Sequence, residues 1–496
     1  MSRMTHGLSR FDTLLKESLN HHALNNGSPL PQVFGYLHEA NPVTGNLGKE
    51  AIVAGFDALV ETMRTSESTN GKADAGMTFF GQFVDHDITL DVQSAIGTRI
   101  DPRSIRNVRT PNLDLDCVYG DGPDGSPYLY SSGNTEGYLL FGREDNPYDL
   151  ARNCKGRALI GDPRNDENII VSQVQGAFVA LHNILMSHLV QETATATDIR
   201  HCAHAGIRTE VWETVIPSNL MKFEEVRRFI RLHYQWVVLN ELLPAFVDKK
   251  TIASTLARDP FGDKGPIIPA EFSGAAYRFG HATVRPSYCL RKGEAPVDLF
   301  TMRGFSPRGP ESTIEMAQFF DVAGTRAQKA LPVGVKMAET LFELPDNIVG
   351  GGLVWGDYKI ELPKAKKLAL RNILRDRTSL ELPSGQQMAA FMGMKPLPLP
   401  QVLKDHDIDK TPLWYYCLQE AETKGQGRLT GVGGAIVAST LIRLLKLDPE
   451  SVIHNPDFFP WAGFGETCTL GNIMQFVENH RDDVVDRESL YCGPVL

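Results

Sequence analysis

The chain has 496 residues, of which 42% are hydrophobic, so it can bury a large core, and its length alone suggests about three domains. Its formal net charge of -10 and its scattered basic residues exclude an extended nucleic-acid-binding surface, and the short basic run at 364–367 is explained by a solvated helix face. No segment is long and apolar enough to cross a membrane, since the best candidate, which begins at Gly431, contains an arginine and runs into a lysine.

The N-terminus and the cysteines bear on the cellular compartment. Residues 1–20 carry no apolar h-region, so no signal peptide is predicted. Seven cysteines are spread along the chain without a CxxC pair, which excludes a zinc ribbon and c-type haem attachment. Their odd number and wide spacing favour free thiols and a reducing compartment. These features leave the compartment open between the cytoplasm and export by an unconventional route.

The hydrophobic pattern predicts a mainly α chain with few short strands. Residues 1–70 are interpreted as an N-terminal lead-in that packs on a domain covering 71–496, and no flexible linker divides that domain. Helical spacing covers 72–92, and 95–150 form a long ordered excursion rich in Gly, Pro, Asp and Asn, with strand-like pieces such as GYLLFG. Further helices are predicted at about 166–192, 222–243, 270–284, 364–376, 411–423, 430–446 and 467–479. Several have wide apolar faces, which favours one large helical domain over three smaller ones.

The first polar motif interrupts an apolar helix. In GQFVDHDITL, three titratable residues stand together between phenylalanines and aliphatic residues. If 78–90 is helical, Gln82, Asp85 and His86 share one stripe. Asp87 lies about 100° further around the axis. One helix could therefore serve two sites.

The segment RTPNLDLDCVYG offers oxygen ligands at short spacing. Thr110, Asp114 and Asp116 lie in a loop, and carboxylate, hydroxyl and carbonyl oxygens suit Ca²⁺. Asp87 could add a third carboxylate. Taken alone, such a loop is more often plain turn chemistry, and an isolated His–Asp pair is more often a satisfied core pair.

Three later blocks also carry polar residues in apolar or capping contexts. In GDPRNDE, Arg164 and Glu167 lie one turn apart at a helix start, where, taken alone, a cap with a surface ion pair is the commoner explanation. In YRFGH, His281 stands among aromatic and small residues, where a neutral imidazole could bind a metal, although core histidines are commoner. In LRNILRDR, Asn372 needs a partner once buried, and an imidazole N–H is one candidate.

Together and in this order, the five blocks GQFVDHD, RTPNLDLDCVYG, GDPRNDE, YRFGH and LRNILRDR resemble the animal-type haem peroxidases of the peroxidase–cyclooxygenase superfamily. The resemblance runs from about 78 to 447, and the calcium-loop block is most similar to bacterial members. Five blocks in the right order are more specific than any one of them. The resemblance implies a single large helical haem peroxidase domain that holds haem b and Ca²⁺.

The resemblance also implies roles for individual residues. His86 would be the distal histidine, with Gln82 beside it and Arg164 as the distal arginine. His281 would be the proximal iron ligand, and Asn372 would accept its second N–H. The other matched positions are Arg278 and Arg375 near the haem propionates and proximal side, Asp85 and Glu167 as possible ester links to haem, and Asp87, Thr110, Asn112, Asp114 and Asp116 as calcium ligands.

The reaction implied is that of a haem peroxidase. Hydrogen peroxide would be reduced through a ferryl intermediate, with His86 as base and then acid and Arg164 supplying positive charge. A halide, thiocyanate or small organic donor would be oxidised. No nucleic-acid partner and no membrane span are expected, and the natural donor and the oligomeric state stay open.

Three other classes of protein share some of these features with a haem peroxidase. Cyclooxygenases and fatty-acid dioxygenases carry their radical tyrosine three residues before the proximal histidine, where this chain has Arg278, and Tyr277 is one position further away. An HD-type metal hydrolase would use His86 and Asp87 together, but it leaves YRFGH and the loop unexplained. A haem-binding structural protein without turnover would not need both His86 and Arg164.

Overall fold

The computed structural model describes residues 34–39, 47–90, 96, 98–99, 101–104, 107, 109–206, 219–262, 265–322 and 324–492. Its helices are α2 (Lys49–Glu61), α3 (Ala75–Ile88), α4 (Asp116–Tyr119), α5 (Gly122–Gly125), α6 (Ile169–Val190), α7 (Ala196–Ala203), α8 (Asn219–Val237), α9 (Leu243–Phe246), α10 (Lys249–Ala257), α11 (Ala270–Gly274), α12 (Gly280–Thr283), α13 (Asp346–Val349), α14 (Leu362–Ala365), α15 (Leu368–Leu374), α16 (Gly385–Phe391), α17 (Gln401–Lys404), α18 (Leu413–Thr423), α19 (Gly431–Leu447) and α20 (Leu470–His480).

The strands are short and pair only two by two in the described part of the chain. β1 (Phe34–Gly35) pairs in parallel with β3 (Ile268–Pro269), and β2 (Arg64–Thr65) with β6 (Met337–Ala338). β4 (Ser287–Tyr288) with β5 (Val297–Asp298), and β7 (Leu353–Trp355) with β8 (Tyr358–Ile360), form antiparallel pairs. The prediction of a mainly α domain with few short strands is confirmed. The strand-like segment GYLLFG makes only isolated bridges, Tyr130 with Leu139 and Phe141 with Leu150.

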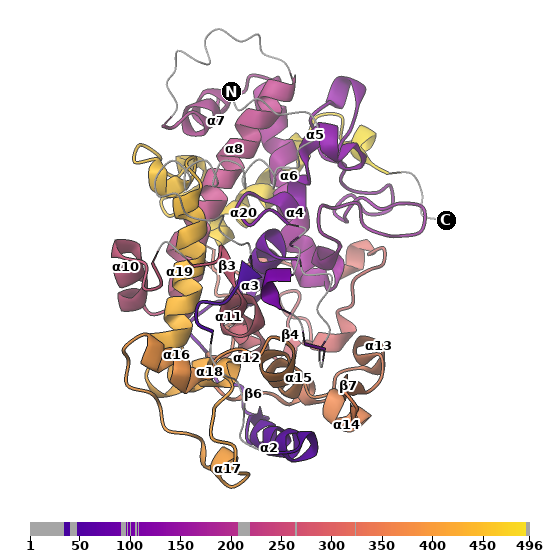
Figure 1. Cartoon of the computed structure of the whole chain (residues 1–496). Helices are drawn as coiled ribbons and strands as arrows, with labels where there is room; N and C mark the ends of the chain where they lie inside the picture. Colours follow the sequence, from indigo (N-terminus) through magenta and orange to yellow (C-terminus); the bar gives the residue numbers. More distant parts are fainter. Residues whose placement is uncertain are drawn as a thin grey trace.

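Long apolar helices form the centre of the molecule, with α3 between α6 and α19 in Figure 1. Helix α6 begins where the Asn168 side chain accepts hydrogen bonds from the backbone N–H groups of Ile170 and Val171, as an N-cap residue commonly does. The prediction that no segment is long and apolar enough to span a bilayer, with the best candidate at Gly431, is wrong, because α6 is one described helix that is. However, 89% of its apolar window is buried inside the protein. That burial is typical of a core helix.

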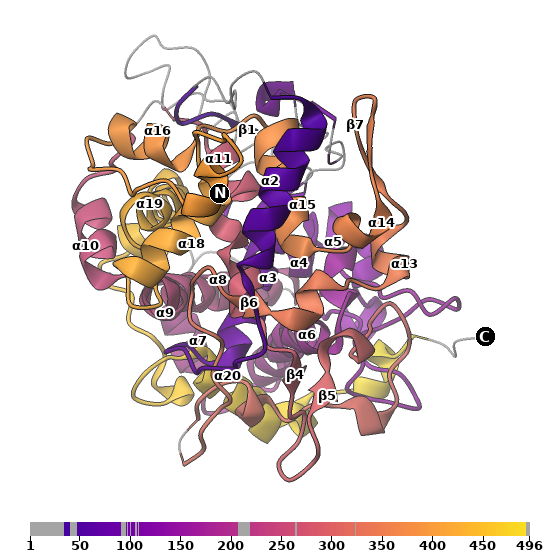
Figure 2. The ribbon, with the colours of Figure 1, turned by 90° about the horizontal axis from the view of Figure 1, so that it is seen from below.

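The predicted lead-in, 1–70, lies largely outside the described residues, so its packing and its lack of a signal peptide stay predictions. Its described part contains α2, which Figure 2 shows running across the lower face of the molecule. α2 buries Phe56 completely, and Lys367 at the start of α15 donates to Asp57 at 2.6 Å. At least this part of the segment therefore packs on the helical body.

Two of the predicted helices are broken inside motifs. The predicted helix at 270–284 is instead α11, a 3-10 turn at Ala276–Phe279 and α12. The chain turns at Ala275, and a Cβ on the preceding Gly274 would lie 2.3 Å from Leu380 Cδ1. The predicted helix at 364–376 becomes α14, α15 and a π-helical turn at Arg375–Ser379. Such turns replace the regular i to i−4 ladder and often occur at functional sites.

Candidate functional site

The two polar faces of α3 contact different parts of the molecule. His86 Nδ1 lies 2.7 Å from Asn165 Oδ1, whereas the Asp87 carboxylate accepts from Tyr234 Oη at 3.0 Å. This is the division that the helical spacing predicts. It also removes the structural basis for the HD-type hydrolase, because His86 and Asp87 do not face a common point.

A chain of side-chain amides orients the His86 ring. Asn165 Nδ2 donates to Gln175 Oε1 at 2.8 Å, and Gln175 Nε2 donates to the Cys117 carbonyl at 3.2 Å. The Asn165 oxygen is therefore turned toward His86 and accepts from Nδ1–H. Among the described residues, Nδ1 is the only hydrogen-bonded nitrogen of the His86 ring. Nε2 is left as an unprotonated, available base.

The environment keeps His86 uncharged. Burial lowers the pKa of His86, and the positive charge of Arg164 lowers it further, against opposing effects of Glu167, Asp85 and Asp162. The imidazole therefore stays neutral at and somewhat below neutral pH. A neutral imidazole with a free Nε2 can accept a proton and return it.

Arg164 is held at the C-terminal end of α3. Its 3-10 turn, Pro163–Asp166, begins at Asp162, whose carboxylate accepts from the Arg164 backbone N–H at 2.9 Å and from Nη2 at 2.8 Å. Nη2 also donates to the carbonyls of His86, at 3.2 Å, and Thr89. The alternative of an exposed Arg164–Glu167 ion pair is wrong, because the partner of Arg164 is the fully buried Asp162.

Asp162 is ionised in spite of its burial. Burial raises the pKa of Asp162, but hydrogen bonding and charge from Arg164 and the charge of Arg109 outweigh it and leave the pKa below its usual range. Arg109 Nε lies 3.2 Å from the same carboxylate. A buried anion between two arginines therefore fixes the cation beside His86.

The other predicted distal residues lie around His86. Gln82 Nε2 donates to Glu167 Oε1, and Asp85 Oδ1 accepts from Thr89 Oγ1 at 3.1 Å. Gln82 and Asp85 are half-buried and Glu167 is exposed, so the distal side is not sealed by protein.

His281 and Asn372 lie together, from α12 and α15. Their side-chain nitrogens Nδ1 and Nδ2 are 2.8 Å apart, so the amide nitrogen rather than the oxygen faces the ring. Rotating the amide by 180° exchanges these nearly identical atoms and would let Oδ1 accept from Nδ1–H, as the resemblance implies. Among the described residues, Nδ1 is again the only hydrogen-bonded ring nitrogen, so Nε2 is free to bind a metal.

Positive charge surrounds His281. Burial lowers the pKa of His281 to about 3, with further contributions from the charges of Arg278 and Arg375. The imidazole is therefore neutral, as a metal ligand must be. Arg278 is held by its Nε, which donates to the Ser273 carbonyl at 2.9 Å. The two arginines are suited to binding the carboxylates of a cofactor.

The segments that carry the two histidines are in direct contact. Thr78 Oγ1 of α3 lies 2.8 Å from Thr283 Oγ1 of α12, and Tyr277 Oη donates to the Gly81 carbonyl at 3.2 Å. These residues fit haem. α3 and α12 each offer a neutral imidazole with a free Nε2, and each imidazole has arginines close by.

The oxygen-rich loop folds against the other face of α3. Asp87 accepts from the backbone N–H groups of Leu115, at 3.2 Å, and Cys117, at 3.3 Å. Thr110 Oγ1 donates to Asp114 at 2.9 Å, and its backbone N–H donates to Asp116 at 3.1 Å.

Buried carboxylates gather in this loop, and Arg109 Nη1 lies 3.5 Å from Asp116 Oδ2. Burial raises the pKa of Asp87 well above its usual value, and the charges of Asp114 and Asp116 raise it further. Three buried carboxylates with Thr110 and Asn112 beside them suit a hard cation such as Ca²⁺. The carboxylates are more spread out than in a compact site, since their oxygens do not all come within 4.8 Å of one another.

Three contributing residues escaped the sequence reasoning. Asn165 and Asp162 stand in the GDPRNDE motif without a predicted role, and Gln175 lies outside the five motifs. A signal existed for Gln175, because an amide stands on a helix whose neighbours are Val174 and Gly176 and would be buried.

Comparisons with known proteins bear on the family and the fold of the chain. The family model for the animal haem peroxidase matches residues 92–397, which include Arg164, His281 and Asn372 and begin just after α3. A chorion peroxidase of Aedes aegypti is 25% identical over 281 residues, covering 53% of this chain and 31% of that protein. The chain thus spans about a third of the length of that relative.

Solved structures share the fold. Peroxidase A from Dictyostelium discoideum aligns with a TM-score of 0.59 at 14% identity, covering 95% of this chain and 97% of that one. A fatty acid alpha-dioxygenase of Oryza sativa aligns with a TM-score of 0.56 at 16% identity, covering 90% of this chain and 80% of that one. At these identities the likeness concerns the fold alone. With the family model matching more than half of its length, the chain belongs to the animal haem peroxidase family.

Proposed function

We propose that the chain is a haem-dependent peroxidase that reduces hydrogen peroxide and oxidises a halide, thiocyanate or a small organic donor. The observation that carries the proposal is the His86 ring, which is neutral, has a free Nε2, is oriented by Asn165 and lies beside the charge of Arg164. A metal hydrolase or a passive haem carrier needs no such arrangement.

In this proposal, haem supplies an iron that binds peroxide and takes up its two oxidising equivalents. His281 would hold the iron through Nε2, and Arg278 and Arg375 would bind the propionates. His86 Nε2 removes the proton from one peroxide oxygen and delivers it to the other. Arg164 stabilises the negative charge that develops as the oxygens separate.

The proposal extends to attachment and to calcium. Asp85 and Glu167 lie on the distal side and are the carboxylates available for ester links to haem. Ca²⁺ at Asp87, Thr110, Asn112, Asp114 and Asp116 would tie α3 to the loop and thereby hold His86 in place. Two contacts support this extension: Glu167 meets Gln82 on one face of α3, and the loop meets Asp87 on the other.

The first test uses the full chain produced with haem and Ca²⁺. We expect a Soret band, one haem per chain by the pyridine haemochrome assay, and peroxide-dependent oxidation of guaiacol. His86→Ala should slow the stopped-flow reaction with peroxide by about 10²–10⁴-fold while the Soret band is retained. A colourless protein, or unchanged kinetics in the variant, would contradict the proposal. Haem that stays with the protein in acid–acetone would support the ester links.

A fatty-acid dioxygenase is the second candidate, because the fold is shared with alpha-dioxygenases. Tyr277 is the tyrosine nearest to the required position, but it lies in a 3-10 turn, stacks on Phe272 and donates to the Gly81 carbonyl. Oxygen uptake with a fatty acid and no added peroxide would favour this candidate. We expect none.

A further inference from the structure

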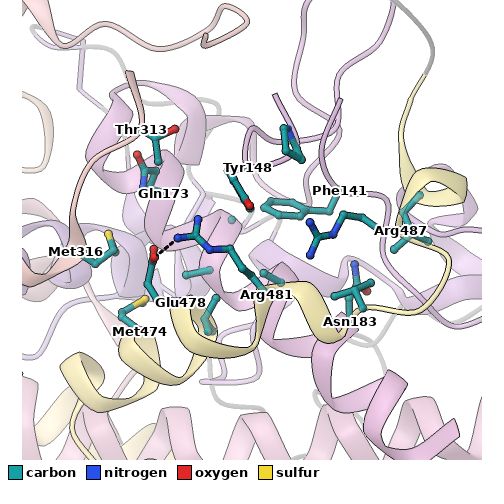
Figure 3. Close-up of a pocket in the computed structure, with 17 residues that line it drawn as sticks. Phe141, Tyr148, Gln173, Asn183, Thr313, Met316, Met474, Glu478, Arg481 and Arg487 are labelled. Carbon is teal, nitrogen blue, oxygen red and sulfur yellow. Dashed lines mark hydrogen bonds and ion pairs between the residues drawn. The ribbon is translucent and has the colours of Figure 1, made fainter. Parts of the chain in front are cut away.

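Beyond the proposed haem site, polar groups gather where α20 meets the end of α6. Figure 3 shows a cavity in this region, lined by Met474 and Glu478 of α20 and by Arg481, which directly follows that helix. Its volume is about 60 Å³, far below the roughly 300–1,000 Å³ of small-molecule pockets, and its Arg481 is paired with Glu478 at 2.6 Å. The cavity is therefore too small for such a ligand. The adjacent end of α20, by contrast, carries a group of potential metal ligands.

Three potential metal ligands meet beside it. They are His188 in the last turn of α6, His480 at the end of α20, and Asp483 in the 3-10 turn Arg481–Asp483. Among the described residues, no other three histidine, cysteine or carboxylate side chains bring ligand atoms within 4.8 Å of one another. His188 lies 19 residues after Ile169, so the cluster is roughly 28 Å along the axis of α6 from its distal-side end.

The distances between the potential ligand atoms are close to those between two ligands of one metal ion. Asp483 Oδ2 lies 3.0 Å from His188 Nε2 and 2.8 Å from His480 Nδ1. Ligands bound to zinc at about 2.0–2.2 Å stand roughly 3.0–3.5 Å from one another. An ion could therefore enter with only small side-chain movements.

Outer contacts hold the two rings in position. His188 Nδ1 lies 2.9 Å from Thr195 Oγ1, a contact that orients the ring with Nε2 toward Asp483. The His480 ring packs on Phe476 with centroids 4.3 Å apart. A hydrogen bond at the second ring nitrogen, as in His188, is typical of histidines that bind metals.

Two of the three potential ligands are accessible to solvent. The His188 side chain is 6% exposed, whereas those of His480 and Asp483 are 39% and 42% exposed. Three protein ligands with an open side leave room for a water molecule as the fourth ligand.

We propose that His188, His480 and Asp483 form a second metal site, which binds a divalent ion of the zinc type with water completing the shell. Two imidazoles and one carboxylate suit zinc better than calcium. The ion would clamp the end of α20 onto α6, where Val485 N–H already donates to Ser187 Oγ at 3.0 Å.

The experiment is zinc binding by the full, haem-loaded chain, with Ca²⁺ kept in excess so that the loop near α3 stays filled. Bound zinc is first removed with a zinc-selective chelator, and Zn²⁺ is then returned by equilibrium dialysis. We expect one ion per chain, with affinity reduced on the order of tenfold or more in His480→Ala and in Asp483→Asn. Asp482→Asn is the matched control, because that neighbouring carboxylate is 84% exposed and pairs with Arg487.

X-ray absorption at the zinc edge gives a second readout that does not depend on variants and is separate from iron. Imidazole scattering with zinc–ligand distances of about 2.0–2.2 Å is the expected result. Absence of stoichiometric zinc, a spectrum without imidazole, or equal affinity in all variants would overturn the proposal and show that Asp483 only accepts hydrogen bonds from two histidines. None of these results would bear on the peroxidase proposal.

Discussion

At the scale of single residues, the distal site depends on a tautomer. His86 has a base at Nε2 only because Asn165 accepts the proton of Nδ1, and Asn165 does so only because Gln175 fixes its amide. Asn165 is thus a positioning residue that acts through His86.

Asn165→Leu removes the acceptor and lets the proton move to Nε2. We expect the peroxide step to slow by about 10–100-fold, with the Soret band unchanged. Asn165→Asp restores an acceptor and should recover most of the rate in stopped-flow measurements. If Leu and Asp at this position behave alike, Asn165 has only a packing role.

The charge of Arg164 should appear in the pH profile. Because Arg164 lowers the pKa of His86, Arg164→Leu raises that pKa, and His86 becomes protonated at a higher pH. The acid limb of the rate of peroxide reduction should therefore move to higher pH. Arg164→Lys keeps the charge and should leave the limb close to its wild-type position, although the rate itself falls. If the acid limb stays at the same pH in Arg164→Leu, the charge of Arg164 does not affect the pKa of His86.

At the scale of elements, α3 is where the two sites meet. Its C-terminal half carries His86 on one side and Asp87 on the other, so whatever neutralises Asp87 also holds the distal helix. The pKa of Asp87 is raised by burial and by Asp114 and Asp116. Without a cation, the folded protein therefore loses stability as the pH rises above the usual aspartate range.

Calcium removal should expose this linkage. In a chelator of Ca²⁺, we expect the midpoint of thermal unfolding to be higher at mildly acidic than at neutral pH, and added Ca²⁺ to raise the midpoint most at neutral pH. Glu271 and Asp376, whose pKa values burial raises to about 7, contribute to the same trend. The comparison with Asp87→Asn isolates the share of Asp87, and an identical calcium response in that variant would place the ion elsewhere.

At the scale of the whole molecule, the long excursion is tied to the distal turn by a buried ion cluster. Arg152 is completely buried, with Nε 2.9 Å from Asp149 and Nη1 2.6 Å from Asp166. Asp166 belongs to the turn that carries Arg164. The position of the Arg164 guanidinium therefore depends on contacts with the segment that precedes this turn.

Arg152→Leu removes the cation that Asp149 and Asp166 share. Asp149 keeps Arg308 at 3.1 Å, whereas Asp166 loses its ion pair with Arg152. The free energy of unfolding should fall by about 3–5 kcal/mol, measured by urea denaturation. Arg157→Leu, an exposed arginine nearby, should change it by no more than about 0.5 kcal/mol. A small effect of Arg152→Leu would mean that the carboxylates take up protons or water instead.

Much of the candidate site could be predicted from the sequence, because its parts lie in short local motifs. The spacing of Gln82, Asp85 and His86 on one helical face follows from helix geometry alone. The breaks before His281 and after Asn372 could not be predicted, because a close approach to Leu380 and a π-helical turn are set by packing with distant segments.

The sequence by itself determined the fold class, the family and the pairs of residue types that a haem site needs, since hydrophobic period and motif order are local properties of the chain. Only the tertiary structure decided which partner each polar group has: Asp162 for Arg164, Asn165 for His86, and Asp483 for His188 and His480. The physical reason is that a buried polar group takes whichever partner the packing brings within hydrogen-bond distance, and that partner can lie hundreds of residues away.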